Sequence, residues 1–211
     1  MPPKKNLKSS FPPAEPGEFR SDIFKQTPHM KPLPITQFGN PILRNGASVV
    51  NVRFLATKQF RELTRAMLFT MRKVGGVGIA APQVGKSIQL TVVEIKKSKV
   101  RPDTRPFPVS VIVNPKITKR SKEIISDWEG CFSLPDVRGL VPRHKSVEVH
   151  YYDAYGKRRI KKLTGLQARV FQHEIDHLNG ILYVDRIKDM KTLMTLEEFK
   201  KRILQKGLKS K

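Results

Sequence analysis

Cysteine is almost absent from this chain of 211 residues, which contains only Cys131. A single thiol forms no intramolecular disulfide, so the disulfide-stabilised scaffolds of small secreted proteins are excluded. Cys131 is therefore either a free thiol or a ligand. The length suits one ordinary domain with tails rather than two domains.

Long apolar runs are missing as well. No stretch of eighteen apolar residues occurs, and the opening segment MPPKKNLKSSFPP lacks the apolar core of a secretory signal. We therefore expect a cytoplasmic protein with no membrane association. The segment before Glu15 is basic and free of acids, so organellar targeting by this segment stays open as an alternative.

Acidic residues are scarce relative to basic ones. The chain has 18 Asp and Glu against 41 Lys and Arg, which gives a formal net charge of +23. Most of this excess lies in the body of the chain rather than at its ends. A basic surface attracts polyanions, of which RNA is the obvious cellular candidate. A merely solvated basic surface explains the composition equally well.

The sequence divides into three parts. Residues 1–30 are rich in proline and show no periodicity, which predicts an extended N-terminal arm. Residues 31–190 contain the periodic segments and motifs, and we expect them to form one catalytic domain. Residues 191–211 form a basic tail, in which residues 196–204 predict a short helix.

Apolar periodicity predicts two main helices. Apolar residues recur at spacings of three and four between residues 60 and 74, and the pattern stops at a pair of glycines. A second helix is predicted to begin at Thr164, with Gln167 completing a capping box, and to end at Gly180. Apolar residues cover most of its circumference, which predicts a position in the interior.

Short β-branched runs between these helices predict strands. They occupy residues 88–95, 109–117, 124–128, 146–152 and 159–163. The segment 96–108, rich in Pro, Lys and Arg, is predicted to be a surface loop. The expected fold class is α+β, with mixed or antiparallel sheets packed around the second helix.

The second helix carries the pentapeptide HEIDH at residues 173–177. Residues four apart lie on one helical face, so His173 and His177 can bind the same metal ion. Glu174 neighbours that face, within reach of a water molecule on the metal. The alternative is two core histidines with ordinary hydrogen-bond partners, but burying two histidines and two acids without partners is costly.

A tetrahedral metal ion that keeps one position for water needs a third protein ligand. No histidine follows His177, and the acids downstream form no recognisable ligand motif. The upstream candidate is Cys131, in the segment EGCFSLP at residues 129–135. These residues alone leave Cys131 open between a metal ligand and a small buried hydrophobe.

A third block, GVGIAAPQ, occupies residues 76–83. It lacks the Gly-Lys-Ser/Thr ending of a phosphate-binding loop, and it follows a helix, so phosphate binding is disfavoured. Its small residues instead allow close approach of another backbone or of a substrate.

Together the three blocks resemble the peptide deformylase family. GVGIAAPQ, EGCFSLP and QHEIDHLNG occur in the family's order, and the similarity covers residues 34–187. The resemblance implies removal of the formyl group from the N-terminal formyl-methionine of nascent peptides, with release of formate. The arm before residue 30 is longer than usual in the family, and Phe132 occupies a position often held by leucine.

The resemblance also implies a role for individual residues. One divalent metal ion is expected at three ligands, Cys131, His173 and His177. Iron(II) is expected natively, with zinc, nickel or cobalt possible in a purified sample. The metal lowers the pKa of water, and Glu174 is expected to act as general base. The Gln83 amide and the Phe132 backbone N–H are expected to stabilise charge on the formyl oxygen.

Other residues are expected around this centre. Glu129 and Arg143 are expected to pair and hold the cysteine segment, and Gln172 to do the same, whereas Asp176 can be a solvated helix acid. Arg138 is expected to contact the peptide farther along. An apolar pocket for methionine is expected to have these walls, with ordinary packing as an equal alternative: Val77, Gly78, Val170 and His173.

Two other functions compete with this one. A zinc endoprotease shares HExxH but needs a third ligand other than cysteine. An RNA-binding or ribosome-associated module with a structural metal would account for the net charge. A deformylase also meets nascent chains at the ribosome, so we expect the tail to bind the ribosome surface through Lys200, Lys201, Arg202, Lys206, Lys209 and Lys211. The sequence leaves the oligomeric state open, although a monomer is favoured.

Overall fold

The computed structural model describes residues 30–97 and 104–205. The predicted N-terminal arm, apart from Met30, lies outside the described residues, as do Lys206, Lys209 and Lys211. None of the helices in the described ranges combines the length and the apolar character that a membrane crossing requires.

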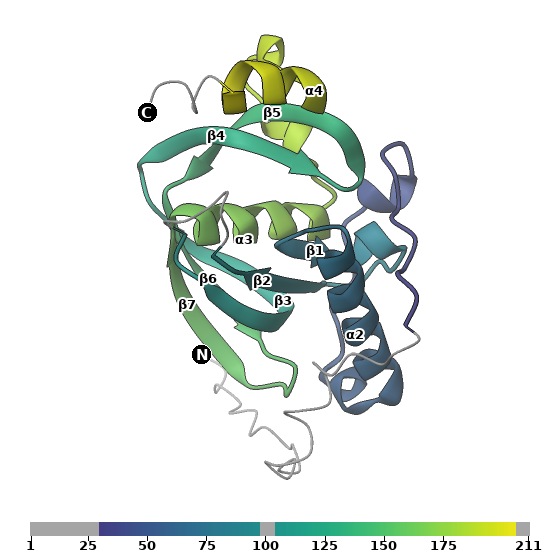
Figure 1. Cartoon of the computed structure of the whole chain (residues 1–211). Helices are drawn as coiled ribbons and strands as arrows, with labels where there is room; N and C mark the ends of the chain where they lie inside the picture. The colour runs from purple at the N-terminus through teal and green to yellow at the C-terminus, as the bar shows by residue number, and fades with distance from the viewer. Residues whose placement is uncertain (1–29, 98–103, 206–211) are drawn as a thin grey trace.

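Two antiparallel sheets form the framework of the described part (Figure 1). Their strands are β1 Gly78–Ala80, β2 Leu90–Ile95, β3 Phe107–Arg120, β4 Ile124–Cys131, β5 Leu134–His144, β6 Ser146–Tyr152, β7 Arg158–Thr164 and β8 Met194–Thr195. The first sheet has the order β1-β2-β3-β6-β7, and the second has the order β4-β5-β8. Helices and antiparallel sheets together confirm the predicted α+β class.

Three α-helices and several shorter turns complete the described part. The α-helices are α2 Lys58–Lys73, α3 Gly165–Leu178 and α4 Leu196–Phe199. The 3₁₀ helices are η1 Pro41–Leu43, η2 Val52–Ala56, η3 Ala81–Val84, η4 Tyr183–Arg186 and η5 Met190–Thr192, and the π-helical turn η6 covers Lys200–Leu204. The predicted tail helix therefore exists, as α4 continued by η6.

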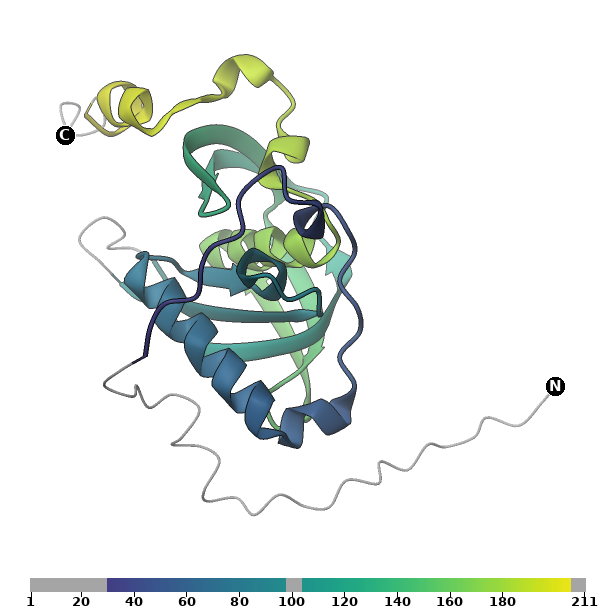
Figure 2. The same cartoon turned by 90° about the vertical axis from the view of Figure 1, so that its right-hand side faces the viewer.

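Helix α2 confirms the first predicted helix. Thr57 caps it, because its hydroxyl accepts a hydrogen bond from the backbone N–H of Phe60 at 3.2 Å. Phe60, Met67 and Met71 are fully buried against the first sheet. The helix ends before Gly75, whose φ of 74° suits glycine. Figure 2 shows α2 crossing one face of this sheet.

Helix α3 lies between the two sheets (Figure 1). Its apolar residues, including Val170 and Phe171, pack against Val149 and Leu163 of the first sheet. The helix ends at Leu178, two residues before the predicted glycine stop at Gly180, whose φ is 74°. The predicted capping box is wrong, because the Gln167 amide donates to the carbonyls of residues 105 and 106 instead. That segment before β3 offers acceptors that the local sequence pattern does not show.

Strands β1, β5 and β8 were not predicted, and β5 matters most for the site. Strands β4 and β5 form a long hairpin that closes at the pair Cys131 and Leu134. Two prolines and a glycine in β5 weaken its β-strand pattern. Strand β4 also runs past the predicted end at residue 128 as far as Cys131. The hairpin therefore delivers the thiol at its tip.

Gly180→Ala tests the junction after α3. Gly180 has a φ of 74°, and an added Cβ would lie 2.3 Å from the carbonyl oxygen of Arg44. We expect a loss of about 3 kcal/mol in the free energy of unfolding, from backbone strain and the clash together. Gly75→Ala has the same φ but open space, so it should cost only about 1 kcal/mol. Chemical denaturation measures both, and equal losses would contradict the clash.

Candidate metal centre

Cys131, His173 and His177 meet where the tip of the β4–β5 hairpin approaches α3. Their ligand atoms all lie within 4.8 Å of one another. The Cys131 Sγ lies 3.2 Å from the His177 Nε2, and the two imidazole centroids lie 4.9 Å apart. One thiol and two imidazoles that converge in this way match the three-ligand sets of catalytic metal sites.

The chemistry of these donors also fits a divalent cation. Burial raises the pKa of the Cys131 thiol, but the neighbouring His177 and His173 outweigh burial, so this pKa is lowered well below its usual value. The thiolate is the form that binds metals. The His177 Nδ1 is buried without a hydrogen-bond partner in the described part of the chain. A metal ion held by these atoms would be shielded from bulk water on most sides.

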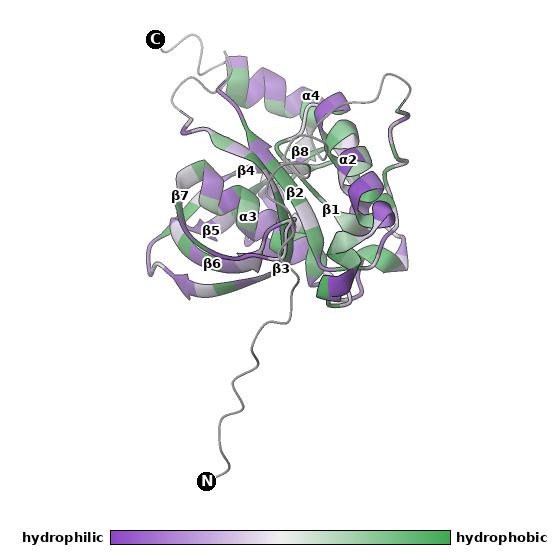
Figure 3. Ribbon diagram, turned by 90° about the horizontal axis from the view of Figure 1, so that it is seen from below, coloured by the Kyte–Doolittle hydropathy of each residue, from purple (hydrophilic) through white to green (hydrophobic). Residues whose placement is uncertain are grey.

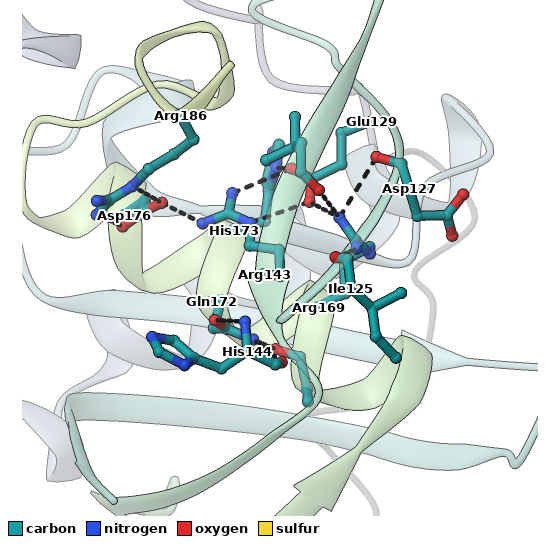
Figure 4. Close-up of polar contacts among 12 residues, drawn as sticks. Ile125, Asp127, Glu129, Arg143, His144, Arg169, Gln172, His173, Asp176 and Arg186 are labelled. Atoms are coloured by element: carbon teal, nitrogen blue, oxygen red, sulfur yellow. Dashed lines mark hydrogen bonds and ion pairs between the residues drawn. The ribbon is translucent and has the colours of Figure 1, made fainter. Parts of the chain in front are cut away.

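Glu129 is the buried acid on which the polar contacts around this centre converge (Figure 4). Its Oε2 accepts a hydrogen bond from the His173 Nδ1 at 2.9 Å, which leaves the His173 Nε2 to act as the ligand atom. Arg143 donates to both carboxylate oxygens at 3.0 Å. Burial raises the pKa of Glu129, but the bonds from His173 and Arg143 outweigh it and lower this pKa far below its usual value. The expected Glu129–Arg143 pair is therefore present.

Asp176 extends this network to the segment after α3. It accepts hydrogen bonds from Arg143 and from two nitrogens of Arg186, at 3.1 and 2.8 Å. Asp176 is buried, so the alternative of a solvated helix acid is wrong. Asp176 of α3 consequently joins Arg143 of β5 to Arg186 of η4 (Figure 4).

Sequence reasoning missed Arg169. This side chain is only 8% exposed, and it donates to Glu129 at 2.7 Å and to the carbonyls of Ile125 and Val141 at 2.7 and 2.9 Å. It therefore ties both strands of the hairpin to α3. Its position one turn before His173, on a helix predicted to lie in the interior, was the available signal.

Gln172 does not contact the cysteine segment as expected. Its side-chain amide instead bonds both backbone groups of His144, accepting from the N–H at 3.1 Å and donating to the carbonyl at 2.9 Å (Figure 4). Gln172 thus fixes the far end of β5 against α3. It supports the hairpin at a distance from the thiol.

Glu174 lies beside the three candidate ligands. It is 4% exposed, and its Oε2 has no hydrogen-bond partner among the residues that the structure describes. Burial raises the pKa of Glu174 to about 7. An added Cβ on Gly78 would lie 2.4 Å from the Glu174 Oε1, so β1 packs directly against this carboxyl. A buried carboxyl with a near-neutral pKa suits a general base.

Gln83 contacts the thiol, and Phe132 follows it in the chain. The Gln83 Oε1 accepts a hydrogen bond from the Ala80 N–H at 2.8 Å, which turns its Nε2 toward the Cys131 Sγ at 3.3 Å. Phe132 lies in the turn between β4 and β5, and its ring packs on Gly76. Gln83 therefore offers a fixed amide donor at the edge of the centre.

The expected substrate residues lie around the same centre. Val77 and Val170 belong to one apolar cluster, which also contains Phe171. The Arg138 guanidinium packs over Gly130, where an added Cβ would lie 2.3 Å from its Nη1. A separate cavity of about 590 Å³ lies between the start of α2 and the loop after η3. None of the predicted site residues lines this cavity. The candidate site is therefore the group of metal ligands around Cys131 and not this cavity.

Comparisons with known proteins identify the family that this chain resembles. Residues 32–193 match the family described as polypeptide deformylase. The chain is 44% identical to peptide deformylase 2 of Nostoc sp., over 79% of this chain and 92% of that protein. It is 40% identical to peptide deformylase 1 of Nitrosomonas europaea, over 75% of this chain and 89% of that protein. A class I type b peptide deformylase from Acinetobacter baumannii, solved with bound Met-Ala-Ser, is 40% identical with a TM-score of 0.72, over 75% of this chain and 99% of that one.

Glu129→Gln tests the polar network around the centre. The substitution removes the charge that compensates two buried arginines and weakens the hold on His173, so the variant should lose about 3 kcal/mol of unfolding free energy. Metal affinity should fall about 10- to 100-fold. Glu123→Gln is the matched control, because its ion pair with Lys145 is exposed and should contribute less than about 1 kcal/mol. Denaturation and metal titration would contradict this interpretation if the two variants behaved alike.

Proposed function

We propose, on the premise that this chain belongs to the polypeptide deformylase family, that Cys131, His173 and His177 hold its metal ion and that Glu174 is its general base. The enzyme is a metal-dependent hydrolase that removes the N-formyl group from the N-terminal methionine of newly synthesised polypeptides. One observation carries the residue assignment: a thiol and two imidazoles lie within 4.8 Å of one another beside the buried Glu174, whose Oε2 has no hydrogen-bond partner among the described residues.

The reaction converts a formamide and water into formate and a free amine. When bound, the metal ion supplies Lewis acidity that lowers the pKa of water and polarises the formyl carbonyl. Glu174 accepts the proton of the attacking water, and it delivers a proton to the methionine nitrogen as the C–N bond breaks. A pKa of about 7 suits both steps, because the carboxyl can then gain and lose a proton near neutral pH.

Two donors are proposed to stabilise the oxygen of the formyl group during attack. Negative charge develops on this oxygen as water adds to the carbon, and a fixed N–H group aimed at it lowers the barrier. The Gln83 amide is held by its bond with Ala80, so its Nε2 needs little reorganisation. The Phe132 backbone N–H, at the hairpin turn, is the second proposed donor.

The methionine side chain is proposed to bind against Val77, Gly78 and Val170. Support comes from the shared apolar cluster of the two valines and from Gly78, which has no side chain to obstruct the approach to Glu174. Arg138, packed over the segment that carries the thiol, is proposed to contact the peptide beyond the first residue.

Iron(II) is the proposed native metal. One thiolate and two imidazoles also suit zinc, nickel and cobalt, so the ligand types do not select among them. Metal analysis of protein purified without oxygen distinguishes these ions.

Glu174→Gln should abolish turnover while it leaves the metal in place. Loss of a general base costs about 10²- to 10⁴-fold in kcat, whereas the amide keeps the shape of the side chain. Formate release from a formyl-methionyl peptide and metal content measure the two effects. Glu197→Gln, at an exposed position on α4, is the matched control and should retain activity.

Cys131→Ser separates this function from a zinc endoprotease. A deformylase with a thiolate ligand should lose metal and activity together. A variant that kept both would favour the endoprotease, which needs a different third ligand.

We also propose that the tail contacts the ribosome surface. Trp128 of β4 holds the tail, with its ring 5.2 Å from the ring of Phe199. The tail cations in the described part are Lys191, Lys200, Lys201 and Arg202, all exposed. Lys201 and Arg202 form ion pairs with acids of the same segment, which reduces the charge available to a polyanion.

Replacement of Lys200, Lys201 and Arg202 by Gln should lower cosedimentation with ribosomes several-fold, because each cation lost removes a phosphate contact. This triple variant changes only charge, whereas deletion of residues 191–211 would also remove β8 and the contact between Phe199 and Trp128. Unchanged cosedimentation would contradict the role of these three residues.

A further inference from the structure

The outer face of the first sheet, on the side away from α3, is divided into two halves. One half carries apolar residues such as Leu90, Val92 and Val111, which pack under α2. The other half consists of the end of β3 together with β6 and β7. Its outward residues include the exposed Lys116 and Arg158. Figure 3, seen from below, shows hydrophilic residues along β7.

Strand register identifies which residues share this second half. Val147, Val149 and Leu163 pack against α3, so their neighbours along β6 and β7 point to the opposite face. Lys116 lies across from His150, and His150 lies across from Ile160. We call the outward set the open basic face; it comprises Lys116, Lys119, His150, Arg158 and Lys162.

The charged residues on this face are predominantly basic. Strands β3 and β7 contribute Lys116, Lys119, Arg158 and Lys162 to it, whereas Glu148 is the one acid of the three strands. Glu148 already accepts from His150 at 3.1 Å and pairs with Lys119 at 3.5 Å. Lys116 and Lys162 have no ion-pair partner within the described ranges. In the tail, two of the four described cations, Lys201 and Arg202, pair with acids of the same segment.

We propose that the open basic face binds RNA through its phosphate backbone. Neighbouring strands lie about 4.8 Å apart, so cations on β3 and β7 form an array across two strand spacings rather than a single point charge. Such an array of cations can follow a phosphate chain, and the counterions that it releases favour binding. His150, on the middle strand, adds a ring on which a base can stack.

The chemistry of this face favours RNA over an anionic membrane. Binding to a membrane surface needs an apolar face that inserts among the lipids as well as cations. Ile160 is the large, strongly exposed apolar residue of the described face, and one isoleucine provides little insertion. The face also lies on the opposite side of the sheet from α3, so bound RNA would leave His173 and His177 accessible. The proposal therefore does not depend on the deformylase reaction.

The test uses the full chain and a labelled single-stranded RNA, with binding measured by fluorescence anisotropy at several salt concentrations. The variant replaces Lys116, Arg158 and Lys162 by Gln. We expect binding to weaken at least about tenfold at 0.15 M salt, and the slope of log affinity against log salt to fall by about two. The matched control replaces Lys73, Lys86 and Lys97, three exposed lysines elsewhere, and should change affinity less than about twofold.

Several outcomes would overturn the proposal. Equal weakening by both triple variants would mean that diffuse net charge, not this face, attracts RNA. Absence of binding by the unaltered protein, or stronger binding to phosphatidylserine vesicles than to RNA, would also exclude it. Thermal melting of each variant reports on folding, and the single substitution Lys162→Glu on the exposed edge strand repeats the test if the triple variant is unstable. Formate release from a short formyl peptide should stay unchanged in all these variants.

Discussion

A buried carboxylate must be compensated by positive charge, and this constraint organises the region around the candidate metal centre. Glu129 is 6% exposed, and its two oxygens accept from Arg143, Arg169 and His173. Buried ion pairs add little net stability compared with apolar packing. Here the ion pairs of Glu129 position other groups: this one carboxylate contacts Arg143 of the hairpin, Arg169 of α3 and the proposed metal ligand His173.

This arrangement explains how residues far apart in sequence form one site. The thiol comes from the tip of a hairpin, while the imidazoles come from a helix that begins more than thirty residues later. Arg143 and Arg169 hold these two elements together through the Asp176 carboxylate and the Val141 carbonyl. A ligand set placed by such contacts is ready before the metal arrives.

The sequence predicted the parts of the site that depend on local spacing. Two histidines one turn apart, a buried helix and its glycine end follow from periodicity alone, and the structure contains them. Strand β5, Arg169 and the contacts of Gln172 and Gln167 escaped prediction, because each depends on partners distant in sequence. The sequence also left open that Asp176 is a solvated helix acid, because its partners Arg143 and Arg186 come from other elements.

The contact between Gly78 and Glu174 has a further consequence for catalysis. A methyl group on Gly78 would overlap the Glu174 carboxyl, because strand β1 packs closely against it. This close packing limits the rotamers that Glu174 can adopt. The conformational entropy of this side chain is therefore lost once, during folding, and is not lost again in every catalytic cycle.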